Sequence, residues 1–139
     1  MGMYTELFLQ VQLKKNTPKV VIDTLNCMLG HKTEALAVMD PPRGLSLFML
    51  QSSSHYHYPF AHSHLDYIDY SDCYYLFVRC DLKNYDNEIE EFLDFIAPYV
   101  DDNNCHYAGH YRYEESEYPT RISFHSDTWF GMKMKGSKV

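Results

Sequence analysis

Four histidines form two closely spaced pairs, His55-x-His57 and His62-x-His64. On an extended segment, residues i and i+2 point to the same side, so each pair could offer two imidazoles to one metal ion. A site of this kind also needs a carboxylate nearby, and the first one after His57 is that of Asp66. We therefore expect no metal and no other cofactor. A small His-rich metal-dependent enzyme with ligands His55, His57, His62 and His64 stays an alternative.

Motifs that activate a nucleophile or cradle a phosphate are missing from the sequence. There is no G-x-S-x-G elbow, no G-x-G-x-x-G loop and no G-K-[ST]. Adjacent acids such as Glu114 and Glu115 fall in an expected turn, where their side chains point apart. We expect no catalytic residues, and we predict a binding protein rather than an enzyme.

Tyrosine and histidine are common in this chain, with 13 and 8 of its 139 residues. Both join an apolar body to a polar tip, which suits a hydrated contact surface. Residues 55–70 contain many aromatic and few aliphatic residues. The general preference of strands for aromatic residues does not explain why aliphatic residues are so few here. The residues predicted to contact a partner are Tyr56, Tyr58, Phe60, His62, His64, Tyr67 and Tyr70, together with Glu90 and Asp94 on an acidic helix.

The net charge of −7 argues against direct nucleic-acid binding by the body of the protein. Three of the 12 basic residues, Lys133, Lys135 and Lys138, lie in the last seven positions, so the rest of the chain is still more acidic. Such a body could compete for a basic groove that normally holds nucleic acid. Solubility alone is an equally weighted explanation.

The bulk composition predicts a single domain in a reducing compartment. A chain of 139 residues that is 45% hydrophobic can bury a core. The four cysteines form no C-x-x-C pair, so we expect buried free thiols. The longest strongly apolar stretch, residues 45–50, is far too short for a membrane span, and the N-terminus does not resemble a signal peptide. We expect a cytoplasmic protein with no membrane partner.

Hydrophobic periodicity predicts two helices. The first spans residues 17–30, with Thr17 as N-cap, Pro18 at the first helical position and Gly30 after the end. The second spans 86–97, with Asp86 as N-cap and acidic residues in its first turn. Leu25 and Phe92 belong to their buried stripes.

The strand pattern surrounds these helices. Residues 6–13 alternate, with Leu7, Leu9 and Val11 on one face and Phe8 on the other. Gly109 interrupts a later strand and indicates a bulge or a close backbone approach. Strands are predicted at 6–13, 45–52, 65–70, 73–82, 105–113 and 119–124, with an edge strand or ordered loop at 55–64 and a flexible tail at 131–139. This order predicts one α+β domain over residues 1–139, with an antiparallel or mixed sheet of about five to six strands and two helices on one face.

Three blocks of the chain resemble a family of small proteins encoded by phages and integrated phage elements. They are Leu-Lys-Lys-Asn-Thr-Pro-x-x-Val-Ile-Asp at 13–23 (with one extra Val), Asp-Leu-Lys-Asn-Tyr-Asp-Asn-Glu-Ile-Glu at 81–90, and Gly-x-Tyr-Arg-Tyr-Glu-Glu at 109–115. Residues 31–70 depart from the family. The resemblance implies a phage accessory protein, and such proteins often inhibit host defence systems, as anti-CRISPR proteins do.

The leading hypothesis is a non-enzymatic, phage-encoded inhibitor of a host defence protein, with a CRISPR effector nuclease as the expected partner. Its negative field would compete for a basic groove while tyrosines and histidines supply the desolvated contacts. The alternative is a protein that sequesters or cleaves a small nucleotide signal. In that case tyrosines and histidines would stack on bases and Arg79, Arg112 or Arg121 would hold phosphate. A homodimer is left open in each case.

Overall fold

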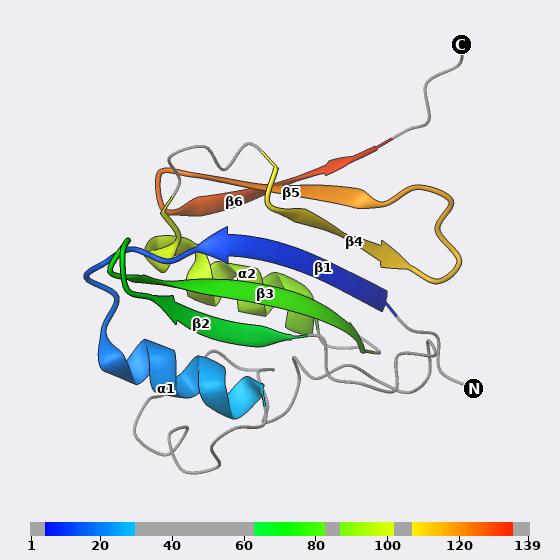
Figure 1. Ribbon diagram of the computed structural model, residues 1–139. Coiled ribbons are helices and arrows are strands. Elements are labelled where there is room, and N and C mark those ends of the chain that lie inside the picture. The colour runs from blue at the N-terminus through cyan, green and yellow to red at the C-terminus, as the bar shows by residue number, and fades with distance from the viewer. Residues whose placement is uncertain (1–4, 30–62, 83–86, 102–106, 135–139) are drawn as a thin grey trace.

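Six strands form one antiparallel sheet in the computed structural model, which describes residues 5–29, 63–82, 87–101 and 107–134. Their order across the sheet is β2-β3-β1-β4-β5-β6 (Figure 1). The α+β class and the strand count predicted from the sequence are confirmed. The strands are β1 (Thr5–Gln12), β2 (His64–Ile68), β3 (Cys73–Leu82), β4 (Gly109–Tyr113), β5 (Thr120–His125) and β6 (Thr128–Lys133).

The two faces of the sheet differ in burial. On β1 the side chains of Leu7, Leu9 and Val11 are buried, while the alternating residues, Phe8 among them, are partly or fully exposed. The same alternation runs along residues 75–80 of β3, where Leu76 is fully buried. We call the face with Leu7 and Leu76 the inner face and the face with Phe8 the open face.

Two helices complete the fold, α1 (Lys19–Met28) and α2 (Glu88–Ile96), and the short 3-10 helix η3 (Ala97–Tyr99) follows α2. Leu25 of α1 and Phe92 of α2 are fully buried, as their periodicity predicted. Both belong to one hydrophobic cluster that includes the inner-face residues of β1 and β3. Figure 1 shows α2 behind β1 and β3 and α1 beside β2. The packing of both helices on one face stays a prediction.

No helix in the described part of the chain is long and apolar enough to cross a membrane.

The predicted N-caps of the helices need correction. The Thr17 hydroxyl donates to the Lys14 carbonyl oxygen at 2.6 Å, so it closes the turn before α1 and does not cap the helix. Pro18 occupies the N-cap position itself, with extended backbone. The N-cap of α2 is Asn87, whose φ of 59° is left-handed, a conformation that Asn tolerates. Asp86 and Gly30 lie outside the described residues.

The C-terminal tail predicted from residue 131 is wrong for its first residues, because β6 extends to Lys133. β5 and β6 form a hairpin in which His125 pairs with Thr128. The two turn residues, Ser126 and Asp127, have φ values of 52° and 62°, as a type I′ turn requires. Residues 135–139 lie outside the described residues.

Other strand boundaries moved by a few residues. β2 begins at His64 and ends at Ile68, so Asp69 and Tyr70 lie in the turn before β3. β4 begins at Gly109, and part of the predicted 105–113 strand lies outside the described residues. The predicted strand at 45–52 and most of the 55–64 segment also lie outside them.

The cysteine prediction holds for three residues. Cys27, Cys73 and Cys80 are buried free thiols, and Cys105 lies outside the described residues. Burial raises the pKa of the Cys80 thiol well above its ordinary value, so this thiol stays protonated and unreactive near neutral pH.

Gly109 makes the close backbone approach that the sequence indicated. Its φ is 155°, and it lies opposite Leu9 where β4 pairs with β1. A Cβ atom built at Gly109 would stand 2.0 Å from the carbonyl oxygen of Phe8 and 2.9 Å from the Cα of Leu9. Only glycine fits there, so this residue sets how closely β4 lies against β1.

Gly109→Ala should therefore destabilise the protein strongly, on the order of 3 kcal/mol, because the clash is with backbone and the φ value is strained for alanine. Chemical denaturation measures this free energy of unfolding. Gly131→Ala is the comparison, since the new Cβ would meet side-chain atoms of Thr120 and Trp129 at 3.0 and 3.1 Å. We expect a smaller loss there because side chains can shift. Equal losses would contradict the assigned role of Gly109.

Candidate binding face

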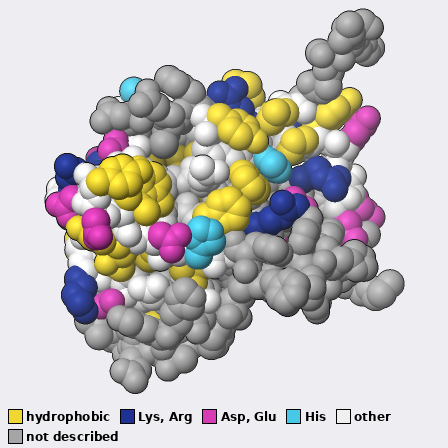
Figure 2. Space-filling view, viewed as in Figure 1, with side chains coloured by type: hydrophobic (Ala, Val, Ile, Leu, Met, Phe, Trp, Pro, Cys, Tyr) yellow, Lys and Arg dark blue, Asp and Glu magenta, His cyan; other side chains and the backbone are white. Residues whose placement is uncertain are grey.

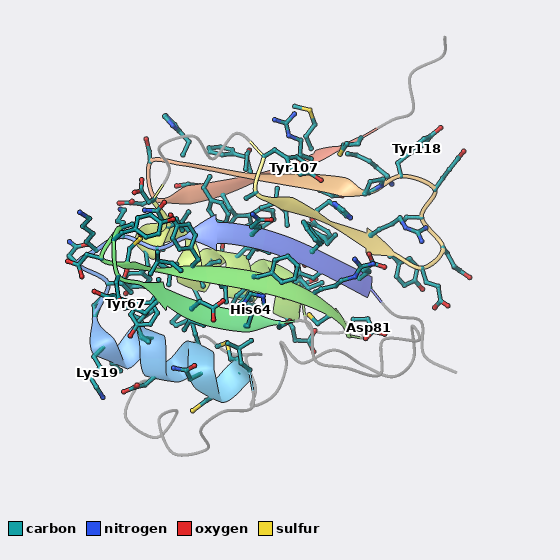
Figure 3. The ribbon with its side chains drawn as sticks, in the orientation of Figure 1. Lys19, His64, Tyr67, Asp81, Tyr107 and Tyr118 are labelled. Atoms are coloured by element: carbon teal, nitrogen blue, oxygen red, sulfur yellow. The ribbon has the colours of Figure 1, made fainter. Side chains whose placement is uncertain are left out.

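Among the residues that the structure describes, the predicted site residues are not gathered in one place. Tyr56, Tyr58, Phe60 and His62 lie outside the described residues, as do His55 and His57. His64 lies on β2, Tyr67 lies farther along the same strand, and Tyr70 lies in the turn after it (Figure 3). Glu90 and Asp94 lie on α2.

A row of aromatic rings in contact with one another crosses the open face. From β2 to β4 it consists of His64, Phe77, Phe8 and His110, one residue from each of four neighbouring strands. His64 stacks on Phe77 with ring centroids 5.2 Å apart and an interplanar angle of 19°. Phe8 meets Phe77 edge to face at 5.5 Å and stacks on His110 at 5.6 Å. We call these four residues the aromatic ladder.

Polar partners hold both ends of the ladder. Nδ1 of His64 lies 2.6 Å from Oδ2 of Asp66, which is two residues along the same strand. Nδ1 of His110 lies 3.0 Å from the Tyr107 hydroxyl. These contacts fix the orientation of each imidazole beside its phenylalanine. Figure 3 labels His64 and Tyr107, which lie on opposite sides of β1.

Three arginines share this face with the ladder. Cross-strand pairing places Arg79 opposite Phe8 and Arg121 opposite His110. The guanidinium carbon of Arg121 lies 5.7 Å from the centre of the Tyr107 ring, a cation–π contact. Arg112 is exposed on β4 and its Nη1 donates to the Ser116 carbonyl at 2.8 Å. Figure 2 shows histidine and basic side chains beside hydrophobic ones across the middle of this face.

Carboxylates lie on the same face. Glu6 pairs across the strands with Asp81 on one side and with Arg112 on the other. Arg112 and Glu6 therefore form an opposite-charge cross-strand pair. The face thus offers rings, guanidinium donors and the carboxylate of Glu6, whereas Asp81 is buried at 7% exposure.

These groups match the chemistry of nucleotide recognition. Aromatic rings on an exposed sheet face stack against bases, and arginine binds phosphate through charge-assisted, bidentate hydrogen bonds. Carboxylates accept hydrogen bonds from base amino groups or sugar hydroxyls. Stacking partners and phosphate donors occur together here, which a purely structural aromatic cluster does not require.

The two histidines of the ladder lie too far apart to act on one phosphate. They belong to β2 and β4, which are separated by β3 and β1, so three strand spacings of about 14 Å in total lie between their strands. A general acid and a general base must both reach the reacting group within hydrogen-bond distance. This geometry suits binding and does not suit cleavage by a His64–His110 pair.

Tyr67 and Tyr70 lie near the other end of β2, at the acidic turn that joins it to β3. The Tyr67 hydroxyl donates a hydrogen bond to Oδ1 of Asp72, and that bond is the largest of the effects that raise the pKa of Tyr67 to about 12. Tyr70 is 92% exposed. The turn thus carries two tyrosines among aspartates. The hydroxyl of Tyr67 is hydrogen-bonded to Asp72, and the side chain of Tyr70 is exposed to solvent.

Asp94 holds α2 to the sheet. Its Oδ1 accepts a hydrogen bond of 2.7 Å from the indole Nε1 of Trp129 on β6. Trp129 in turn makes an edge contact with Tyr111, and the charge of Glu90 helps, after burial, to raise the pKa of Tyr111. Asp94 therefore contacts β6 through Trp129, and Glu90 acts through its charge on Tyr111 of β4. Sequence reasoning named both as residues that contact a partner and did not foresee these contacts within the fold.

Among the described residues, no group of three or more His, Cys, Asp or Glu side chains could hold a metal ion. Three of the four histidines proposed as ligands lie outside this part of the chain, and His64 contacts Asp66. The metal-enzyme alternative stays a prediction.

Sequence reasoning missed Phe8 and Phe77 as candidate site residues. A signal was present, because the alternation of residues 6–13 places Phe8 on the face opposite the leucines. A large aromatic on the polar side of an amphipathic strand indicates a contact surface. The arginines had been named, and the structure puts all three on the ladder's face.

The Tyr67–Asp72 contact predicts that the contribution of Tyr67 to the stability of the fold depends on pH. A tyrosine whose pKa rises from 10.0 to about 12 on folding stabilises the fold below pH 10, and this contribution is lost as pH rises through about 12. In an NMR titration of ring-labelled tyrosines, Asp72→Asn should move the Tyr67 pKa down towards 10. Asp69→Asn is the control and should lower it less, because Asp69 acts only through its charge. A larger shift with Asp69→Asn would contradict the assignment.

Comparison with known proteins found no relative: no family model, no curated protein and no solved structure matches the chain.

Proposed function

We propose that the open face binds a small nucleotide and sequesters it. The bases of the nucleotide stack on the aromatic ladder. The phosphates of the nucleotide bind Arg79 and Arg121, and Arg112 lies at the margin of the site. The observation that carries this proposal is the ladder itself, four rings in contact across four strands on the same face as three arginines. The resemblance to phage-encoded proteins would make such binding a means of removing a host defence signal.

The charge of the protein favours a small ligand over a nucleic-acid strand. Polymer binding requires many phosphate contacts within a positive field, and this chain carries a net charge of −7. A nucleotide with two or three phosphates needs only the few arginines of the open face. Sequestration is preferred to cleavage because His64 and His110 cannot flank one phosphate.

Substitutions in the ladder and in the neighbouring arginines should weaken nucleotide binding without unfolding the protein. Phe77→Leu removes a stacking surface worth about 1–3 kcal/mol per base, so affinity should fall about tenfold. Arg121→Gln should cause a similar loss because it removes a charged phosphate donor. Calorimetric titration with cyclic di-AMP, ATP and a short oligo-dT measures each affinity.

Lys19→Gln is the matched charge control, since Lys19 lies on α1 with its side chain 86% exposed and pairs with Asp23. It should leave nucleotide affinity unchanged. Lack of binding to any nucleotide, or equal losses in all three variants, would refute the proposal. Tighter binding of oligo-dT than of the small nucleotides would refute the choice of ligand class.

The acidic inhibitor of a host defence protein is a second candidate, and the β2–β3 turn favours it. Tyr70 stands 92% exposed there, and the hydroxyl of the neighbouring Tyr67 is held by Asp72. An exposed tyrosine among aspartates could enter a basic groove of a partner as an anchor.

Purified CRISPR effector nuclease provides the test of this second function. DNA binding by the nuclease should fall when the protein is added, and Tyr70→Ala should restore it at unchanged melting temperature. Phe77→Leu should leave this inhibition intact, which separates the two functions. DNA binding that is unaffected by the wild-type protein would exclude this nuclease class as the partner.

A further inference from the structure

The strand at one edge of the sheet, β6, has hydrogen-bonding groups that face away from its neighbour. Within the described residues, β6 is the last strand and pairs only with β5. The backbone N–H of Met134 donates to the Pro119 carbonyl at 2.8 Å, so residue 134 points its backbone groups towards β5. By the alternation of an antiparallel ladder, Trp129, Gly131 and Lys133 point theirs outwards.

Within the described part of the chain, this edge lacks the protection that exposed strands normally carry. Edge strands are blunted by charges, prolines or bulges, and the β2 edge carries Asp66 and His64. β6 has a single charged residue, Lys133, at its end. Phe130 and Met132 are 52% and 67% exposed, and Met134, just beyond the strand, is 40% exposed. Exposed apolar side chains therefore lie next to the outward-pointing backbone N–H and C=O groups of β6.

β6 is complementary to itself in one register. If Gly131 faces Gly131 of a second copy in antiparallel pairing, all three outward-pointing residues of each strand form hydrogen-bonded pairs. Phe130 then lies opposite Met132 of the second copy, a favourable sulfur–aromatic pair. Trp129 lies opposite Lys133 of the second copy, where a cation–π contact forms. Each contact occurs twice by symmetry, and glycine at the two-fold axis puts no side chain in the way.

We propose that the protein forms a homodimer by antiparallel pairing of β6 with β6 of a second copy, centred on Gly131. The pairing is isologous and closed, so it stops at two copies. It joins the two sheets into one and places both open faces on the same side, since Phe130 and Met132 belong to that face. The proposal does not depend on what the open face binds.

The mass in solution tests the dimer first. Light scattering coupled to size exclusion should give twice the monomer mass of 16.4 kDa at high concentration. Met132→Lys should weaken the dimer about tenfold or more, because the change acts twice across the two-fold axis. Tyr70→Lys adds the same charge at the other edge of the sheet and should leave the mass unchanged. A monomer at every concentration, or a dimer unaffected by Met132→Lys, would overturn the proposal.

Amide hydrogen exchange tests the register. In the dimer the amides of Gly131 and Lys133 should be protected, and this protection should disappear in Met132→Lys. The amides of Phe130 and Met134, which point to β5, should stay protected in both proteins and so report that the hairpin is folded. A dimer in which Gly131 and Lys133 exchange as fast as in the monomer would show that another surface associates.

Discussion

The structure depends on β1, which is hydrogen-bonded to β3 on one side and to β4 on the other. Since side chains alternate along a strand, its eight residues decide what enters the core and what faces outwards. Leu7 and Leu9 are buried at 0% exposure, and Phe8 between them joins Phe77 and His110 in the ladder. A slip of one residue would exchange the two faces. The contact of Gly109 with the backbone of β1 opposes such a slip.

The elements with strong periodicity could be predicted from the sequence. β1, β3 and both helices were placed to within about three residues, because buried stripes leave a regular hydrophobic pattern. β6 was missed because its turn is Ser126-Asp127, which lacks the Asn-Gly or Asp-Gly signal of a type I′ hairpin. The N-caps were missed because Thr17 is used in a turn of its own, a competition that local sequence does not reveal.

The candidate site could be predicted only in part, because its residues are far apart in the chain. Dense local clusters such as residues 55–70 attract attention in a sequence, whereas the ladder takes one ring from each of four strands. Its members meet through strand order and register, which depend on pairings between residues as distant in the chain as Phe8 and His110. The arginines were found because phosphate chemistry singles them out. The rings Phe8 and Phe77 resemble ordinary strand residues until the register is known.

The acidic composition and the arginine-bearing face are compatible physically. Long-range repulsion from the net charge of −7 acts on any polyanion and grows with its number of phosphates, while the arginines act over a few ångströms. A strand of nucleic acid meets mainly the repulsion, whereas a small nucleotide can lie wholly within reach of the ladder and its guanidinium groups. Two joined sheets would double the number of such places without altering this balance. If the open face binds a nucleotide as proposed, the net negative charge, which repels polyanions, would also give the face its selectivity for small ligands.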